Sequence, residues 1–229
     1  MGKKQMAGPD DSYYAHLPLH RSMLRDRVRC EAFRQALIKS VQPNYVVLDV
    51  GAGTGILSLL AVQAGARRVY AVERTSIVNL TRQLIAANGA QQQVQVIHGD
   101  MESIELPEQV DLIVSEWLGG YGVDEGFLPA VLSARERWLK PGGLMLPERV
   151  TAWIAPVYDS VLEQDMNFWR SKPYGVDLSL IAEATSNELF WERHHVTKET
   201  LLASPQQMWA IDAYTCSIEE ARAPFTASL

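Results

Sequence analysis

The sequence predicts a doubly wound α/β domain followed by a second, β-rich unit. From residue 45 to about 147, short apolar runs alternate with segments of helical periodicity. Continuous apolar runs of this kind suit strands that are buried on both faces of a parallel sheet. A glycine-rich turn, Asp49 to Gly55, joins the first run to the helix that follows it. After Pro147 the alternation stops, which marks the start of a different unit.

The first unit begins with a predicted amphipathic helix. Residues 20–38 place apolar side chains at near-helical spacing. The strands expected after it are 45–50, 67–73, 94–98 and 110–115, and the expected helices are 56–66, 76–88 and 127–139. The run Pro141-Gly142-Gly143 is expected to end the last of these helices. Residues 1–147 are therefore predicted to form an N-terminal helix and a Rossmann-like domain.

The second unit, residues 148–229, has a different pattern. Residues 150–157 alternate like a strand, 159–169 have helical spacing, and 206–216 again resemble a strand. We expect part of a β-barrel-type domain that carries a helical insertion.

Composition excludes several functional classes. The formal net charge of -6 disfavours nucleic acid as a partner, because a nucleic-acid binder needs a basic face. No apolar run approaches the length of a membrane span. The two cysteines, Cys30 and Cys216, lie far apart without metal-ligand spacing. We expect no metal site and a reducing compartment, the cytoplasm or, in a eukaryote, also the nucleus.

The turn from Asp49 to Gly55 is the strongest sign of a nucleoside site. Gly51, Gly53 and Gly55 would let the backbone turn sharply and approach a ligand closely. Their spacing is G-x-G-x-G, whereas dinucleotide-binding domains use G-x-G-x-x-G. Glu73 ends the second predicted strand, where a carboxylate can accept both ribose hydroxyls. Asp100-Met101-Glu102 follows the third strand and places a carboxylate where an adenine amino group would lie, with Met101 and Glu102 as cofactor-binding residues. The set favours S-adenosylmethionine over NAD.

Two glutamates bracket a glycine-rich loop after the fourth predicted strand. Glu116 and Glu125 stand on either side of glycines that would let the loop fold back on itself. Paired carboxylates can hold a guanidinium through its planar N–H donors. Holding it would place one nitrogen in line with the cofactor's methyl group, and positioning supplies much of the rate. Mutual repulsion would raise the pKa of one carboxyl group, which is the candidate base.

These motifs together resemble the protein arginine N-methyltransferase family, and the resemblance covers nearly the whole chain. The segment Ser115–Glu125 looks like the double-glutamate loop of that family. Three further runs are similar to the corresponding sequence segments of that family: AHLPLHRSMLRDRVRCEAFR, VLDVGAGTGILSL and LPEQVDLIVSEW. The resemblance implies transfer of a methyl group from S-adenosylmethionine to a guanidino nitrogen of arginine in a protein substrate.

The resemblance also assigns roles to residues of the N-terminal segment and of the loop. It implies that Arg29 pairs with the methionyl carboxylate and that His20 and Met23 line the cofactor and active site. Tyr14 matches one of the family's paired tyrosines, and Tyr14, Met23 and Trp117 would contact the substrate. Residues 162–188 would form the helical arm through which family members dimerise, so a homodimer is expected.

This chain departs from the family pattern in three places. Leu118-Gly119-Gly120 stands where the family usually has Met-Gly-Tyr, and Asp10 replaces the first paired tyrosine. The family's Thr-His-Trp loop has no counterpart among these residues, and Asp26 matches the acid that pairs with its histidine. Two alternatives therefore stay open: a methyltransferase acting on free arginine or another small amine, and a weakly active, cofactor-binding partner subunit.

Overall fold

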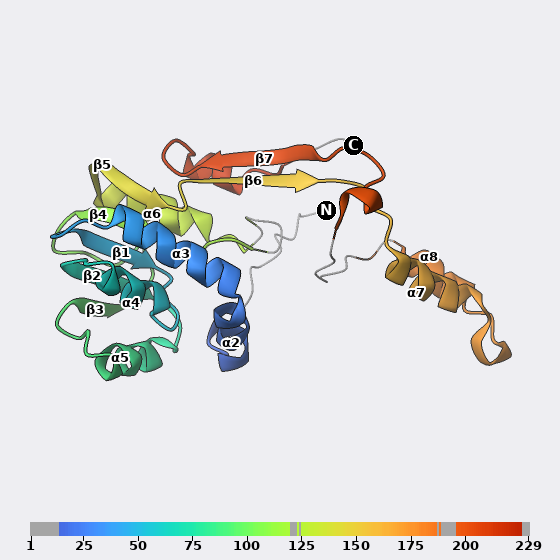
Figure 1. Ribbon diagram of the computed structural model, residues 1–229, viewed down its shortest axis with the longest axis horizontal. Helices are drawn as coiled ribbons and strands as arrows, with labels where there is room; N and C mark the ends of the chain where they lie inside the picture. Colours follow the sequence, from blue (N-terminus) through green and yellow to red (C-terminus); the bar gives the residue numbers. More distant parts are fainter. Residues whose placement is uncertain (1–13, 120–122, 124, 187, 189–195, 226–229) are drawn as a thin grey trace. The chain divides into compact units, whose positions relative to one another are not determined.

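The computed structural model describes residues 14–119, 123, 125–186, 188 and 196–225 (Figure 1). These residues form two compact units. The first runs to Val150 and also contains Ala210–Pro224, which return to it from later in the chain. The second consists of Thr151–Trp209 and Phe225. The unit boundary thus lies within a strand, three residues beyond Pro147.

A five-stranded parallel sheet forms the centre of the first unit, which confirms the predicted doubly wound α/β class. Its order is β3 (Val94–His98), β2 (Arg68–Glu73), β1 (Val46–Val50), β4 (Val110–Val114) and β5 (Leu139–Leu146). The chain leaves β1 toward one edge of the sheet and later continues from β4 toward the other. The order therefore reverses between β1 and β4, and the crevice at their carboxyl ends is where such sheets bind ligands.

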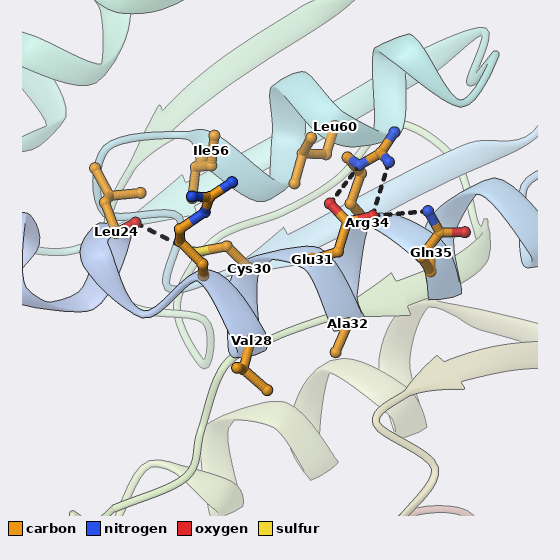
Figure 2. A pocket seen from close by; sticks show the side chains of 10 residues that line it. Leu24, Val28, Cys30, Glu31, Ala32, Arg34, Gln35, Ile56 and Leu60 are labelled. Atoms are coloured by element: carbon orange, nitrogen blue, oxygen red, sulfur yellow. Dashed lines mark hydrogen bonds and ion pairs between the residues drawn. The ribbon is translucent and has the colours of Figure 1, made fainter.

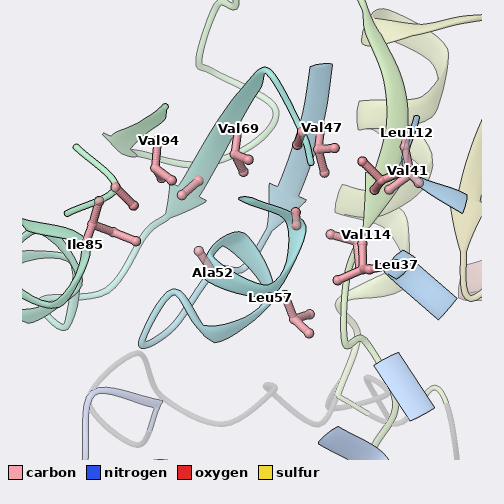
Figure 3. Packing of buried hydrophobic residues seen from close by; sticks show 14 residues of the cluster. Leu37, Val41, Val47, Ala52, Leu57, Val69, Ile85, Val94, Leu112 and Val114 are labelled. Carbon is pink, nitrogen blue, oxygen red and sulfur yellow. The ribbon is translucent and has the colours of Figure 1, made fainter. Parts of the chain in front are cut away.

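The core lies between one face of the sheet and three helices: α3 (Arg27–Ser40), α4 (Ile56–Gln63) and α5 (Val78–Ala87). Val47, Val69 and Leu112 occupy adjacent positions on neighbouring strands and pack against these helices (Figure 3). Leu37 of α3 is fully buried in the same cluster. Burying such a side chain contributes roughly 1.5–3 kcal/mol. Helix α6 (Leu128–Trp138) packs against strands β1, β4 and β5.

The N-terminal segment forms two helices, so the prediction of a single helix over 20–38 is wrong. Helix α2 (Leu17–Arg25) ends before Asp26, and α3 begins directly after it. Asp26 has non-helical torsions (φ -72, ψ 84), and its carboxylate accepts a hydrogen bond from the backbone N–H of Arg29 at 3.1 Å. Aspartate favours this capping position because it satisfies an otherwise unpaired helix donor. The apolar spacing continues across the break and conceals it.

The sequence pattern did not predict strand β5. The run from Lys140 to Gly143 has turn composition, yet it lies inside a strand that pairs with β4 through a register shift between Val110 and Leu112. A bulge of this kind accommodates glycine and proline within a ladder.

The remaining elements follow β5. Strands β6 (Arg149–Ile154) and β7 (Gln206–Asp212) form a two-stranded sheet, and α9 (Ile218–Arg222) follows β7. The second unit contains α7 (Ser160–Arg170), a helical turn η1 (Pro173–Gly175), α8 (Ser179–Thr185) and a turn η2 (Lys198–Thr200). The periodicity predicted α7, and α8, which packs against it, lies within the helical arm that the resemblance implied. Among the described residues, no helix has the length and apolarity that crossing a bilayer requires.

Candidate functional site

The three glycines of the turn after β1 serve different purposes. All three adopt a positive φ, at +75, +53 and +81 for Gly51, Gly53 and Gly55. A Cβ on Gly51 would lie 2.6 Å from the Phe127 ring, and one on Gly53 would lie 3.0 Å from His20. A Cβ on Gly55 would instead press on the α5 side chains that pack beneath the turn. Gly51 and Gly53 thus allow the Phe127 and His20 rings to lie close to the turn, and Gly55 allows α5 to pack beneath it.

Glu73 lies at the carboxyl end of β2, beside the glycine turn, and is only 6% exposed. Its Oε2 accepts a hydrogen bond from Gly53 N at 2.8 Å, and its Oε1 accepts one from Thr75 N at 2.7 Å. An ionised carboxylate has about four acceptor positions, so two remain for other donors. Thr81 of α5 is fully buried and donates to the Gly53 carbonyl oxygen, a support that sequence reasoning did not identify.

Asp49, the last acid within β1, is completely buried below the turn. Its Oδ2 accepts a hydrogen bond from the Ser58 hydroxyl at 2.7 Å. Within the part of the chain that the structure describes, its Oδ1 is buried without a hydrogen-bond partner. Burial raises the pKa of Asp49 to about 7, against a smaller opposing effect of the Ser58 hydrogen bond.

The segment after β3 forms a tight turn. Met101 is 4% exposed, whereas Glu102 is exposed to solvent. The N–H groups of Ser103 and Ile104 both bond the Asp100 carbonyl oxygen. The turn therefore presents one buried apolar and one exposed acidic side chain at the same end of the sheet as Glu73.

Glu116 lies two residues beyond β4, on the other side of the β1–β4 crevice. The preceding Ser115 is buried, and its hydroxyl donates to the Val50 carbonyl oxygen at 2.7 Å, which ties the ends of β4 and β1 together. Glu116 Oε2 accepts a hydrogen bond from Arg29 Nη1 at 2.9 Å, and its Oε1 accepts one from Leu118 N at 3.2 Å. The resemblance implied that Arg29 pairs with a ligand carboxylate, and it did not indicate the pairing with Glu116.

The pKa of Glu116 is raised above its usual range, as expected for one of the paired acids. Burial is the main cause, and the Arg29 charge and the Leu118 N–H oppose it. The charge of Glu125 raises this pKa further, but by less than burial does. The predicted cause, mutual repulsion, is therefore the lesser one. The two carboxyl groups interact, although residues 120–122 and 124 of the loop between them lie outside the described part.

The N-terminal segment places His20 over the glycine turn. His20 is 6% exposed, and its Nε2 donates to the Tyr14 carbonyl oxygen at 2.7 Å. Its ring covers Gly53, since a Cβ added to that glycine would meet the ring at 3.0 Å. Met23 is half-buried on α2. Trp117, which the resemblance assigned to the substrate, is 1% exposed.

Comparison with known families matches both units. Residues 47–143 match a methyltransferase domain, and residues 148–229 match the arginine methyltransferase oligomerization subdomain. The chain is 39% identical over 230 residues to protein arginine N-methyltransferase 6 of Xenopus laevis, covering 96% of this chain and 68% of that protein. The chain belongs to the protein arginine N-methyltransferase family.

Other members of the arginine methyltransferase family are similar over most of this chain. A probable protein arginine N-methyltransferase 6 of Arabidopsis thaliana is 40% identical over 90% of this chain and 48% of its own length. The Trypanosoma brucei PRMT1 enzyme-prozyme heterotetrameric complex, solved with AdoHcy, aligns with a TM-score of 0.79 at 31% identity. That alignment covers 89% of this chain and 64% of the other. The chain thus spans between about half and two thirds of the length of these relatives.

Proposed function

We propose that this chain transfers a methyl group from S-adenosylmethionine to a guanidino nitrogen of arginine in a protein substrate. The observation that carries the proposal is the position of Glu116. It is a largely buried carboxylate with a raised pKa, and it lies across the β1–β4 crevice from the glycine turn and Glu73. A guanidinium ion is a cation with planar donors that such a carboxylate can hold.

The residues around the turn fit an S-adenosyl group. Glu73 is fixed by two backbone N–H groups and keeps acceptor positions that suit ribose hydroxyls. Gly51 and Gly53 lack the Cβ that would press on the Phe127 and His20 rings, so these two rings can lie close over the turn. Arg29 would neutralise the methionyl carboxylate, and Met101 and Glu102 would hold adenine. When bound, S-adenosylmethionine supplies a methyl group activated by its sulfonium. The related T. brucei complex contains AdoHcy, which supports the same assignment.

Glu116 and Glu125 would hold the guanidinium and accept its proton. The arriving cation favours the ionised form of Glu116, so substrate binding lowers the pKa that burial has raised. Both carboxylates would then fix one guanidino nitrogen facing the methyl group, where orientation supplies much of the rate. Tyr14 and Met23 would border the substrate at the N-terminal helices.

Incubation with methyl-labelled S-adenosylmethionine tests the proposal. One sample receives an arginine-rich peptide, a second receives the same peptide with lysine in place of arginine, and a third receives free arginine. We expect label in the arginine peptide alone. Label in free arginine would instead support a small-molecule methyltransferase. Binding of the cofactor without transfer to any acceptor would support a weakly active partner subunit.

We further propose that two copies associate through the helical arm formed by α7 and α8. An open groove of about 720 Å³ lies along α3 and the start of α4 (Figure 2). Its lining is mainly apolar and includes Val28, which is 83% exposed, and Ile56 and Leu60. The arm exposes apolar side chains of its own, Val161, Phe168 and Leu180.

The groove and the arm are complementary in chemistry, since each leaves large apolar side chains in water. Such surfaces on a soluble protein mark interaction sites. A groove on one copy that receives the arm of the other makes a closed, two-fold pair, because each copy supplies both parts. The match of residues 148–229 to the oligomerization subdomain supports this assignment.

A further inference from the structure

Arg137 makes four hydrogen bonds to the turn that follows β3. It lies in the last turn of α6, far from that turn in the sequence. Its Nη1 donates to the carbonyl oxygens of Met101 at 2.8 Å and Glu102 at 3.1 Å. Its Nη2 donates to the carbonyl oxygen of Ile104 at 2.7 Å and to Glu105 Oε1 at 2.9 Å. One guanidinium thus connects to four consecutive or near-consecutive residues.

The turn does not supply donors for the carbonyls of Met101 and Glu102 itself. Its own N–H groups at Ser103 and Ile104 are directed to the Asp100 carbonyl oxygen, so they do not satisfy the carbonyls of Met101 and Glu102. The contacts at the Met101 and Ile104 carbonyls are partly buried, and a partly buried carbonyl in an irregular segment gains from a donor elsewhere in the chain. A guanidinium presents five N–H donors in a rigid plane and can serve several carbonyls at once.

The surroundings hold Arg137 itself in place. Its guanidinium carbon lies 5.0 Å from the centroid of the Trp138 ring, an arrangement that favours a cation. Its side chain is 28% exposed, so most of it is shielded. Glu105 is 80% exposed, and an ion pair with so exposed a partner adds little. The bonds to the three carbonyl oxygens are therefore the ones that define the geometry.

We propose that Arg137 is a positioning residue for adenine recognition. By fixing the carbonyls of Met101 and Glu102, it sets where the buried Met101 side chain and the acidic Glu102 side chain stand at the end of β3. Arg137 does not touch the base. This inference rests on the proposed function, because it assumes that these two residues meet the adenine of the cofactor.

The two effects of Arg137, on the fold and on the site, predict different results. A residue that only stabilises the fold would change the melting temperature and leave the choice of nucleobase unaltered. A residue that positions Glu102 would change the discrimination between adenine, whose amino group can donate to a carboxylate, and hypoxanthine, which has an oxygen there. The relevant quantity is the ratio of the two affinities.

Calorimetric titration of the 229-residue chain with S-adenosylhomocysteine and S-inosylhomocysteine measures this ratio. We expect the wild-type chain to prefer the adenine compound. In Arg137→Ala, the affinity for S-adenosylhomocysteine should fall about tenfold, while that for S-inosylhomocysteine changes little. Arg137→Lys should lie between them, because an ammonium donates but lacks the planar fork. Glu105→Gln, the matched control, should bind both compounds as the wild type does.

A folded Arg137→Ala chain with wild-type affinity and base preference would overturn the inference. Should Arg137→Ala not fold, Arg137→Gln keeps the stem of the side chain and carries the same expectation, with thermal unfolding as the check of folding. A wild-type chain that binds S-adenosylhomocysteine without any base preference would overturn the inference and leave the proposed function standing. A wild-type chain that binds neither compound would overturn both.

Discussion

The Arg29 guanidinium donates a hydrogen bond to Glu116 Oε2 at 2.9 Å and so joins helix α3 to the end of β4. Asp26, which caps α3, fixes the backbone of Arg29 three residues later. The N-terminal segment therefore sets the position and the charge of the carboxylate that we propose to hold the substrate. A change at Arg29 should reach Glu116 without any change to the sheet.

Replacing Arg29 by glutamine should raise the pKa of Glu116 further. The Arg29 charge lowers this pKa, against the larger effect of burial, so its loss favours the protonated acid. The carboxylate would then form only at higher pH, and the acidic limb of the pH–rate profile should move to higher pH. Carbon-13 NMR of the Glu116 carboxyl group measures the shift directly. Arg34→Gln, on the same helix and paired with Glu31, is the control and should leave Glu116 unchanged.

Asp49 should make the protein less stable as the pH rises. Its folded-state pKa of about 7 lies above the ordinary aspartate value of 3.8, so the folded protein holds this proton more tightly than the unfolded chain does. The free energy of unfolding should therefore fall between about pH 4 and pH 7, by an amount on the order of a few kcal/mol. Asp49→Asn cannot ionise and should be the more stable protein at pH 8. Urea unfolding at pH 5 and pH 8 measures the free energy of unfolding of the wild type and of Asp49→Asn. An equal change with pH in the two proteins would refute this account.

Gly51→Ala should weaken cofactor binding and stability together. The new Cβ would lie 2.6 Å from the Phe127 ring, and the residue would keep a φ of +75 that alanine disfavours. We expect a loss of roughly 1–2 kcal/mol of stability. Adding Phe127→Ala should relieve the clash and leave the cost of the backbone conformation. If the loss in free energy of unfolding of the double variant equals the sum of the losses of the two single variants, the Phe127 ring is not what Gly51 accommodates.

Val28→Glu should favour the monomer and leave the fold intact. Val28 is 83% exposed and lines the groove that we propose receives the arm of a second copy. A charge there must be desolvated on association, whereas in the monomer it stays in water. Sedimentation velocity measures the outcome. Ile38→Glu is the control on the same helix, exposed but outside the groove lining, and should sediment as the wild type does. Unchanged association of Val28→Glu would exclude the groove as the arm's site.

Local patterns were enough to predict the parallel sheet and the residues near its carboxyl edge. Apolar runs such as Val46 to Val50 are buried on both faces, and strands of that kind leave a clear signal. Glu73 ends one such run, and the glycine turn and Glu116 come just after two others. Their common location is a consequence of parallel topology, in which the carboxyl ends of the strands meet at one edge.

What the sequence concealed depends on contacts between distant residues. The break at Asp26 leaves the apolar period intact, and the strand through Gly142 and Gly143 forms only because β4 pairs with it across a register shift. The pairing of Arg29 with Glu116 and the support of the Met101 turn by Arg137 join residues that no local pattern connects. The resemblance assigned Trp117 to the substrate, and no local pattern indicated that its side chain would be 1% exposed.

The most direct test of the account is methyl transfer to an arginine-rich peptide by the wild type and by Glu116→Gln, with S-adenosylhomocysteine affinity measured on the same samples. Glutamine keeps the size of the side chain and removes the charge that holds a guanidinium. We predict that turnover falls by about a hundredfold or more while the affinity for S-adenosylhomocysteine stays within about threefold. Glu125→Gln should behave in the same way. Turnover by Glu116→Gln close to that of the wild type would contradict the account.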